Sequence, residues 1–209
     1  MYPPSNSHFG LAPSAWITRF ANLVPVGARV LDLACGYGRH ALYFAARGAR
    51  VVAIDRDATA LATLTGVAGI ETRLVDLESR PWSSGDQQFD AIVVSHYLHR
   101  PLLGNLCAAL AADGTLLYET FATGNEAYGR PSNPAFLLRA GELLELAAAA
   151  KPSLTVVAFE QGLADDADRP AVVQRLAAVG PARTWPPPLG NTDASLRSKP
   201  AKASAAPLG

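Results

Sequence analysis

The sequence predicts an α/β protein with a doubly wound sheet of seven strands, six of them parallel and the last antiparallel. Three observations support this prediction. Short apolar runs alternate with helical patterns along most of the chain. The strand runs are continuously apolar, which is typical of strands covered by helices on both faces. Only the short polar segment 161–169 joins the last two runs, whereas a parallel crossover needs about a dozen residues or more.

The expected elements follow one another from the N-terminus. Ser14 is expected to cap a first helix, which ends before Pro25 and Gly27. Gly48 is expected to stop the helix that follows the first strand. The runs that we expect to form strands are 29–34, 50–54, 71–75, 89–95, 115–121, 154–160 and 171–179. The helical patterns are 14–23, 39–47, 57–64, 101–111 and 140–150.

The two ends of the chain differ from this body. Residues 1–13, which include Tyr2 and Phe9, are rich in Pro, Ser and Asn and are expected to form an irregular arm. Residues 186–209 begin with a run of prolines, contain few large apolar side chains and are expected to be disordered. The sequence therefore predicts a single domain over residues 14–185.

Composition excludes several classes of protein. The chain has 209 residues, 49% hydrophobic and 17% charged, so it can bury a core without disulfides or metals. No stretch approaches about 18 consecutive apolar residues, and the N-terminus lacks the pattern of a signal peptide. Cys35 and Cys107 give neither a disulfide framework nor zinc-ligand spacing, so we expect a cytoplasmic protein without a metal. A formal net charge of zero gives no electrostatic footprint for nucleic acid, and the alanine-rich composition is typical of a GC-rich bacterial genome.

The segment 30–41 runs from the first strand through a glycine turn into a helix. Its glycines, Gly36 and Gly38, allow a tight turn and a close approach of the backbone to a ligand. With Asp55 further along the chain, the turn is close to a dinucleotide-binding fingerprint. Asp32 favours another ligand, because a buried carboxylate suits an ammonium or sulfonium cation better than a pyrophosphate. A strand–helix turn without any ligand is the remaining interpretation.

The residues of the turn are Asp32-Leu33-Ala34-Cys35-Gly36-Tyr37-Gly38. This segment resembles the first motif of class I S-adenosylmethionine-dependent methyltransferases, an acidic-x-Gly-x-Gly-x-Gly pattern. Ala34 stands where the family usually has Gly, a small change that shifts the turn without abolishing it. The resemblance covers residues 14–180 and includes the antiparallel seventh strand. It is closest to small bacterial stand-alone methyltransferase-domain proteins, which are distantly similar to the tellurite-resistance methyltransferase type.

The resemblance implies S-adenosylmethionine as the cofactor, bound by residues that follow the first four strands. Ser95 and His96, which end the fourth strand, are implied to lie near the methionine part. The residues of the turn that are implied to bind the cofactor are Asp32, Ala34, Cys35, Gly36 and Gly38.

The second and third strands are implied to end at the adenosine part of the cofactor. Asp55 would accept hydrogen bonds from both ribose hydroxyls, and Arg56 would line the adenine. Asp76 would accept a hydrogen bond from the adenine amino group, and Leu77 would supply a backbone N–H donor. Simpler alternatives remain: Asp55 as a surface carboxylate, Asp76 as a turn residue, and Asp57 as a helix cap.

The segment after the fourth strand lacks two motifs that mark particular acceptors. It has no Asn/Asp-Pro-Pro-Tyr/Phe, which argues against methylation of adenine N6, cytosine N4 or a glutamine amide. It has no Pro-Cys pair, which argues against attack on cytosine C5 through a cysteine. Cys107 lies in an apolar helical pattern and is expected in the core.

His99, Glu119 and Arg130 are the candidates for the acceptor side, because they lie beyond the strand ends expected to hold the methyl group. His99 follows the fourth strand, Glu119 ends the fifth, and Arg130 lies in the long loop that leaves it. A helix-start role for His99 and a loop-bracing role for Arg130 are the alternatives. His96 and His99 are not expected to bind a metal, because no third ligand has a fitting spacing.

The sequence thus predicts methyl transfer to a small-molecule acceptor by in-line displacement, with much of the acceleration supplied by positioning. A methyltransferase acting on tRNA is the first alternative, which the neutral body and the lack of an RNA-binding module make less favoured. A non-catalytic S-adenosylmethionine-binding module and an NAD(P)-dependent oxidoreductase are alternatives of another class. No membrane partner is expected.

Overall fold

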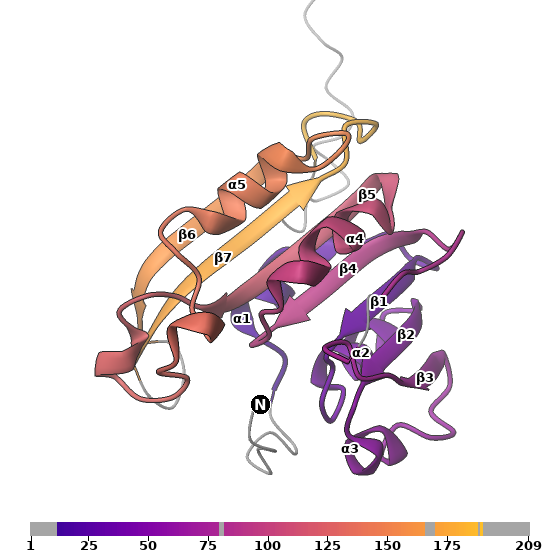
Figure 1. Ribbon diagram of the computed structural model, residues 1–209. Helices are drawn as coiled ribbons and strands as arrows, with labels where there is room; N and C mark the ends of the chain where they lie inside the picture. Colours follow the sequence, from indigo (N-terminus) through magenta and orange to yellow (C-terminus); the bar gives the residue numbers. More distant parts are fainter. Residues whose placement is uncertain (1–11, 80–81, 166–169, 188, 190–209) are drawn as a thin grey trace, which may run out of the picture.

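A computed structural model describes residues 12–79, 82–165, 170–187 and 189 of the chain (Figure 1). Most of the predicted N-terminal arm, with Tyr2 and Phe9, lies outside the described residues, and so does most of the predicted tail over 186–209. The predictions for these two ends therefore stay predictions.

The sheet has seven strands in the order β3-β2-β1-β4-β5-β7-β6. The β7 strand is antiparallel to both of its neighbours, and every other neighbouring pair in the sheet is parallel. The predicted fold class, six parallel strands with an antiparallel last strand, is confirmed. The strands are β1 Arg29–Leu33, β2 Arg50–Asp55, β3 Ile70–Leu74, β4 Phe89–Ser95, β5 Leu110–Phe121, β6 Thr155–Ala164 and β7 Ala171–Val179.

Helices cover both faces of the sheet, and Figure 1 shows α4 and α5 on the same face. The core accordingly has two layers. Alternate residues of a strand contribute to opposite layers, as Val30 and Leu31 do in β1. This explains why the strand sequences are continuously apolar. The α-helices are α1 Ala15–Arg19, α2 Arg39–Ala46, α3 Ala58–Ala62, α4 Leu103–Ala108 and α5 Glu142–Ala149. The 3₁₀ turns are η2 Ala21–Leu23, η3 Arg100–Leu102, η4 Asn125–Ala127 and η5 Pro134–Phe136.

The predicted caps are present at two helices. The Ser14 hydroxyl accepts hydrogen bonds from the N–H groups of Trp16 and Ile17, so it caps α1. Asp57 caps α3 by accepting from two N–H groups of its first turn, which confirms the helix-cap alternative for this residue. The helix predicted over 14–23 is shorter than expected, because its second half is the 3₁₀ turn η2.

The boundary between α4 and β5 was predicted wrongly. The helical pattern extends to residue 111, but α4 ends at Ala108 and β5 begins at Leu110 instead of Thr115. Leu110 pairs with Phe89 at the start of β4, and the N–H of Phe89 donates to the carbonyl of Ala109. Pairing with a distant strand therefore overrides the helix propensity of the alanines that follow.

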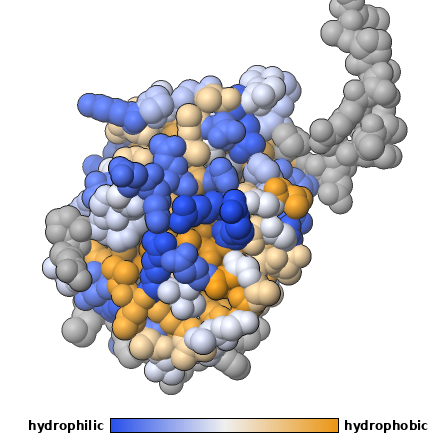
Figure 2. All heavy atoms as spheres, turned by 90° about the vertical axis from the view of Figure 1, so that its right-hand side faces the viewer, coloured by the Kyte–Doolittle hydropathy of each residue, from blue (hydrophilic) through white to orange (hydrophobic). Residues whose placement is uncertain are grey.

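The β3 side of the sheet is polar where it meets solvent. Figure 2 turns that side of the molecule to the viewer and shows hydrophilic side chains gathered in the middle of the face. On β3 itself, the guanidinium Nε of Arg73 lies 2.7 Å from the carboxylate of Glu71. Charged side chains on an edge strand oppose pairing with another sheet. None of the helices in the described part of the chain has the length and apolar character needed to cross a bilayer.

Candidate functional site

The glycine turn between β1 and α2 is held by backbone hydrogen bonds and by one carboxylate. The N–H of Cys35 donates to the carbonyl of Ile54 over 3.0 Å, and the N–H of Gly36 donates to Asp55 Oδ2 over 2.7 Å. Gly38 closes the turn, and a Cβ atom at this position would lie 2.5 Å from the side chain of Leu64. The φ angle of +73° at Gly38 and this close packing both favour glycine, and the turn is tied to the end of β2.

Ala34 marks the one departure from the family motif, and the structure shows its cost. Its φ angle is +53°, in the left-handed region that glycine adopts easily. A residue with a Cβ is disfavoured there by about 1–2 kcal/mol. The turn nevertheless has its hydrogen bonds, so the prediction that alanine does not abolish it agrees with the geometry.

Asp32 lies directly beneath the turn and is 1% exposed. Its Oδ2 accepts a hydrogen bond of 2.9 Å from the N–H of Ala41 in the first turn of α2. Burial raises the pKa of Asp32 to about 7, although the Ala41 N–H and the nearby Arg39 guanidinium act in the opposite direction. A carboxyl group in this state gains from a cationic ligand, because such a ligand stabilises its ionised form.

Asp55 ends β2 and is half-buried. Besides the Gly36 contact, its Oδ1 accepts from the N–H of Asp57 over 2.9 Å. Each carboxylate oxygen has two acceptor lone pairs, so both retain capacity for a further donor. Asp55 is therefore more than a surface carboxylate, since it joins the turn after β1 to the start of α3.

The loop after β3 lies beside Asp55. Asp76 is exposed, and its Oδ1 accepts a hydrogen bond from the N–H of Glu78 over 3.0 Å. Asp76 therefore acts as a turn residue, which is the alternative that the sequence left open. Leu77 is buried in the core layer, and the guanidinium of Arg56 lies 3.9 Å from the carboxylate of Glu78. These residues lie at the carboxyl ends of neighbouring parallel strands.

A row of polar side chains crosses the carboxyl-terminal part of the sheet from β4 to β6. Ser95, Glu119, Arg175 and Glu160 are direct cross-strand neighbours in that order. The Ser95 hydroxyl donates to Glu119 Oε1 over 3.1 Å. Arg175 lies 3.4 Å from Glu119 and 3.4 Å from Glu160, and Arg19 of α1 lies 2.9 Å from Glu160.

Two residues of α2 connect this row to the N-terminal segment, and sequence reasoning missed both. Arg39 donates to the Ser95 hydroxyl over 3.0 Å and to the carbonyl of Ala12 over 3.4 Å. His40 is 3% exposed, and its Nε2 accepts from the N–H of Ser14 over 3.2 Å. Burial, helped by the charges of Arg39 and His96, lowers the pKa of His40 to about 3, so it acts as a neutral acceptor.

The three acceptor-side candidates have different surroundings. Glu119 is 5% exposed and hydrogen-bonded, His99 is half-buried, and Arg130 is exposed in the loop after β5. His99 occupies the position before the 3₁₀ turn η3, where its carbonyl accepts from the N–H of Leu102 over 3.0 Å. The backbone of His99 therefore begins the 3₁₀ turn, as the helix-start alternative predicted. His96 has a φ angle of +55°, and its ring stacks on Phe121 with centroids 4.9 Å apart.

Arg100 braces the loop over 122–141, a role that the sequence pointed to only in Arg130. Its guanidinium makes two hydrogen bonds to the carboxylate of Glu142, of 2.7 and 2.9 Å. It also donates to the carbonyls of Ala135 and Leu137. These contacts hold the loop against the end of β4. A Pro directly after an Arg at the start of a turn was the only signal, and it does not reveal the distant partner.

Tyr97 is a second residue that sequence reasoning missed. Its hydroxyl is buried and has no hydrogen-bond partner in the part of the chain that the structure describes. Burial raises the pKa of Tyr97, and the charges of Glu78, Asp76 and Asp55 add to this effect. Tyr97 therefore extends from the end of β4 toward the loops after β2 and β3.

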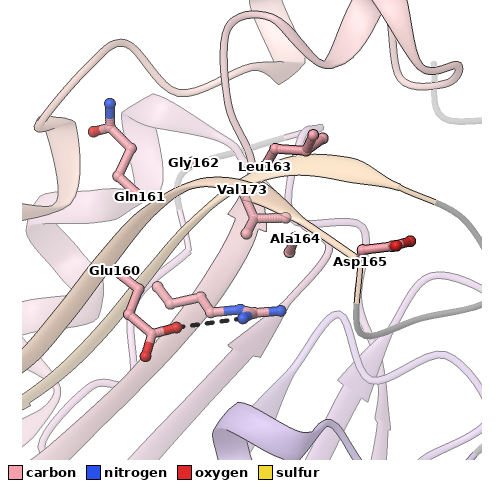
Figure 3. Close-up of a pocket in the computed structure, with 8 residues that line it drawn as sticks. Glu160, Gln161, Gly162, Leu163, Ala164, Asp165 and Val173 are labelled. Carbon is pink, nitrogen blue, oxygen red and sulfur yellow. Dashed lines mark hydrogen bonds and ion pairs between the residues drawn. The ribbon is translucent and has the colours of Figure 1, made fainter.

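A shallow hollow of about 430 Å³ lies at the end of the β6–β7 hairpin (Figure 3). Glu160 and Gln161 point to opposite faces of the hairpin, and Glu160 pairs with Arg175. The hollow is therefore continuous with the polar row that begins at Ser95. Over the described ranges, no three His, Cys, Asp or Glu side chains are grouped so that they could hold a metal ion.

Residues 30–114 match the model of a family described as a methyltransferase domain. This part of the chain is therefore similar to a methyltransferase domain. The match begins in β1 and ends in β5, so it includes the glycine turn, Asp55, Asp76 and the end of β4. This match agrees with the predicted superfamily, the class I methyltransferases that use S-adenosylmethionine. No curated protein matches the chain.

Solved structures with this fold include several methyltransferases. TehB from Haemophilus influenzae has a TM-score of 0.64 and 19% identity, over 78% of this chain and 61% of the TehB chain. This chain thus spans less than two thirds of TehB. An S-adenosylmethionine-dependent methyltransferase from Mesorhizobium loti has a TM-score of 0.61 and 19% identity, over 79% and 98% of the two chains. Coclaurine N-methyltransferase, bound to N-methylheliamine and SAH, has a TM-score of 0.52 and 18% identity, over 70% and 49%. At these identities the similarity concerns the fold.

Proposed function

We propose that this protein transfers the methyl group of S-adenosylmethionine to a small-molecule acceptor. The observation that carries the proposal is the pair of carboxylates at the glycine turn. Asp32 lies buried beneath the turn with a pKa near 7, and Asp55 holds the N–H of Gly36. A nucleoside that carries a cationic amino-acid end requires one carboxylate for the cation and another for the ribose.

The residues present fit this cofactor. The ammonium of its methionine part would lie against Asp32, and its ribose hydroxyls would donate to the lone pairs that Asp55 retains. The backbone of the turn, from Ala34 through Cys35 and Gly36 to Gly38, would approach the cofactor closely, because the space where Gly36 would carry a Cβ is open.

The adenine and methionine ends would be bound by the neighbouring strand ends. Asp76, the backbone N–H of Leu77, and Arg56 would surround the adenine, next to Asp55 at the carboxyl ends of β2 and β3. Ser95 and His96 would lie near the methionine part, at the end of β4. Ligands of open α/β sheets bind at this edge, where the strand order reverses between β1 and β4.

The chemistry needs few groups from the protein. The sulfonium supplies an electrophilic methyl carbon and a neutral leaving group, so the chain contributes mainly alignment of the acceptor. A general base is required only where the acceptor must lose a proton. We place His99, Glu119 and Arg130 on the acceptor side, where Glu119 accepts a hydrogen bond from the Ser95 hydroxyl.

A small acceptor is favoured over nucleic acid by the formal net charge of zero. The fold is also that of coclaurine N-methyltransferase, whose structure contains the small molecule N-methylheliamine. We further propose that residues 14–185 form the catalytic domain. Free thiols at Cys35 and Cys107 support a reducing, cytoplasmic setting.

Isothermal titration calorimetry with S-adenosylmethionine, S-adenosylhomocysteine and NAD tests the cofactor. We expect the two sulfur compounds to bind and NAD to give no heat. Tight binding of NAD without a response to either sulfur compound would falsify the proposal. Release of S-adenosylhomocysteine on incubation with metabolite pools, and none with bulk tRNA, is expected for a small-molecule enzyme.

Once the acceptor is known, the variants Arg130→Ala and His99→Ala test whether these two residues lie on the acceptor side. Groups that touch only the acceptor affect turnover and spare cofactor affinity. We therefore expect both variants to bind S-adenosylmethionine like the wild type and to lose most activity. Loss of cofactor affinity in proportion to activity would move the residue to the cofactor side.

A further inference from the structure

An apolar strip lies beside the polar row, on the same face of the sheet and nearer to its carboxyl edge. Phe121, Val173 and Gly162 are direct cross-strand neighbours on β5, β7 and β6. Each lies two residues beyond a member of the polar row, and residues two apart in a strand share a face. Ala164 continues the strip along β6. We call these four residues the apolar shelf.

The apolar shelf is not part of the hydrophobic core. Phe121 is half-buried and Val173 is 8% exposed, yet neither belongs to the two core layers of the described residues. A Cβ atom at Gly162 would have no neighbour within 4 Å among the residues that the structure describes. The side chains of Val173 and Ala164 point to the same face of the hairpin as Glu160, at the hollow (Figure 3). The shelf is therefore apolar surface with open space above it.

The β5 end of the shelf leads to the reaction site. The ring of Phe121 stacks on the ring of His96, with centroids 4.9 Å apart and an angle of 24° between the planes. His96 directly follows Ser95, the last residue of β4, and its positive φ angle is of the strained kind that gathers at functional sites. In the sheet, β5 lies on the opposite side of β4 from β1 and its glycine turn. The stacked pair thus connects the shelf to the end of β4 from the acceptor side.

The form of the shelf suits a flat ring. Neighbouring strands lie about 4.8 Å apart, so the shelf extends for about 10 Å from Phe121 to Gly162, close to the length of two fused six-membered rings. The small residues Gly162 and Ala164 leave room for the thickness of a ring at one end. The stacked aromatic pair at the other end gives a second ring an offset or edge-on contact.

The charges beside the shelf balance one another. Arg175 lies 3.4 Å from Glu119 and 3.4 Å from Glu160, and Arg19 lies 2.9 Å from Glu160. Two carboxylates are thus paired with two guanidinium groups within this set. A charged acceptor would lose hydration on the shelf without gaining a counter-ion from it, whereas an uncharged acceptor loses less. The polar row therefore favours an uncharged molecule.

We propose that the apolar shelf binds the acceptor, and that this acceptor is an uncharged, flat aromatic molecule whose reacting atom lies at the His96 end. This inference rests on the proposed function and names its class of substrate. It also gives Phe121, Val173 and Ala164 a role in selecting the acceptor.

Four probes test the class of acceptor by calorimetry on the protein loaded with S-adenosylhomocysteine. They are 2-naphthol, its saturated and non-planar analogue decahydro-2-naphthol, the anion 2-naphthoate and the cation 2-naphthylmethylammonium. We expect 2-naphthol to bind about three- to tenfold more tightly than the saturated alcohol, the range for one aromatic contact. We expect it to bind at least about tenfold more tightly than either ion, because only the ions lose a charged hydration shell.

Two neighbouring substitutions locate the bound ring. Ala164→Phe fills the far end of the shelf and should weaken 2-naphthol by about tenfold or more. Leu163→Phe introduces the same ring one residue away, on the other face of the hairpin, and is the matched control, which should stay within about twofold of the wild type (Figure 3). Phe121→Leu should weaken 2-naphthol by about three- to tenfold. Melting temperatures and unchanged affinity for S-adenosylhomocysteine establish that the variants are folded.

Nuclear Overhauser effects place the probe relative to the reaction. We expect them between the naphthol ring and the methylene groups beside the sulfur of bound S-adenosylhomocysteine. Absence of these effects in the ternary complex, equal affinities for 2-naphthol and its saturated analogue, or tighter binding of either ion would overturn the inference. Equal effects of Ala164→Phe and Leu163→Phe would do the same. If the folded protein does not bind S-adenosylhomocysteine at all, the proposed function itself fails.

Discussion

Ionisation of Asp32 should control how tightly the cofactor binds. The carboxyl is buried, and its pKa in the ligand-free protein is about 7. Only the ionised form pairs with the ammonium of the cofactor. We therefore expect the affinity for S-adenosylhomocysteine to increase as the pH rises from 5.5 to 7, and Asp32→Asn to lose this dependence.

The magnitude follows from the ionised fraction. With a pKa of about 7, roughly 3% of the carboxyl is ionised at pH 5.5 and half at pH 7. If the bound carboxyl stays ionised across this range, the association constant increases about 15-fold. Asn can keep the hydrogen bond from the N–H of Ala41 through its amide oxygen but has no proton to lose.

Calorimetry at three pH values between 5.5 and 7 measures this slope in both proteins. The amino group of the ligand stays protonated in this range, and so does not contribute to the slope. His40 stays neutral because its pKa is about 3. A flat profile in the wild type, or the same slope in Asp32→Asn, would refute the reasoning.

Unfolding without ligand gives an independent check of the sign. The pKa of Asp32 is raised in the folded state, so its contribution to stability is present below its unfolded value of 3.8 and is lost as the pH rises through 7. Relative to Asp32→Asn, the wild type should lose about 1.4 kcal/mol of unfolding free energy per pH unit between 4 and 7. A constant difference between the two proteins would mean that the carboxyl is not perturbed.

Three further outcomes are expected. Asp55→Ala should weaken the binding of S-adenosylhomocysteine by about 2–4 kcal/mol, because it removes two charge-assisted hydrogen bonds that water replaces only in part. Unchanged affinity in a folded variant would place the ribose elsewhere. The pKa of His40 is lowered, so stability is lost as the pH falls from about 6.5 toward 3, by about 2 kcal/mol at pH 5. Thermal melts at pH 5 and 7.5 should show this loss, and His40→Gln should abolish it. Arg100→Met removes two hydrogen bonds from the buried carboxylate of Glu142, which then keeps only its contacts with Arg139, so it should cost about 1–3 kcal/mol and speed proteolysis within residues 122–141; an unchanged cleavage rate would contradict the bracing role.

The sequence alone determined the architecture of the sheet and the place of the glycine turn. Both depend on local patterns, because continuous apolar runs, turn glycines and the length of a connection are readable from neighbouring residues. The short link after residue 160 was sufficient to predict the direction of β7. The turn residues and Asp55 were found in the same way, from their spacing relative to strand ends.

Only the tertiary structure decided which distant side chains meet. The last strand, β7, lies between β5 and β6 in the sheet, so Glu119 meets Arg175. No local pattern encodes such a pair, since a cross-strand contact depends on which strands are neighbours and on their register. The same holds for Arg39 with Ser95 and for Arg100 with Glu142. A charged residue at a helix start predicts a solvated surface equally well, until packing places its partner within hydrogen-bond distance.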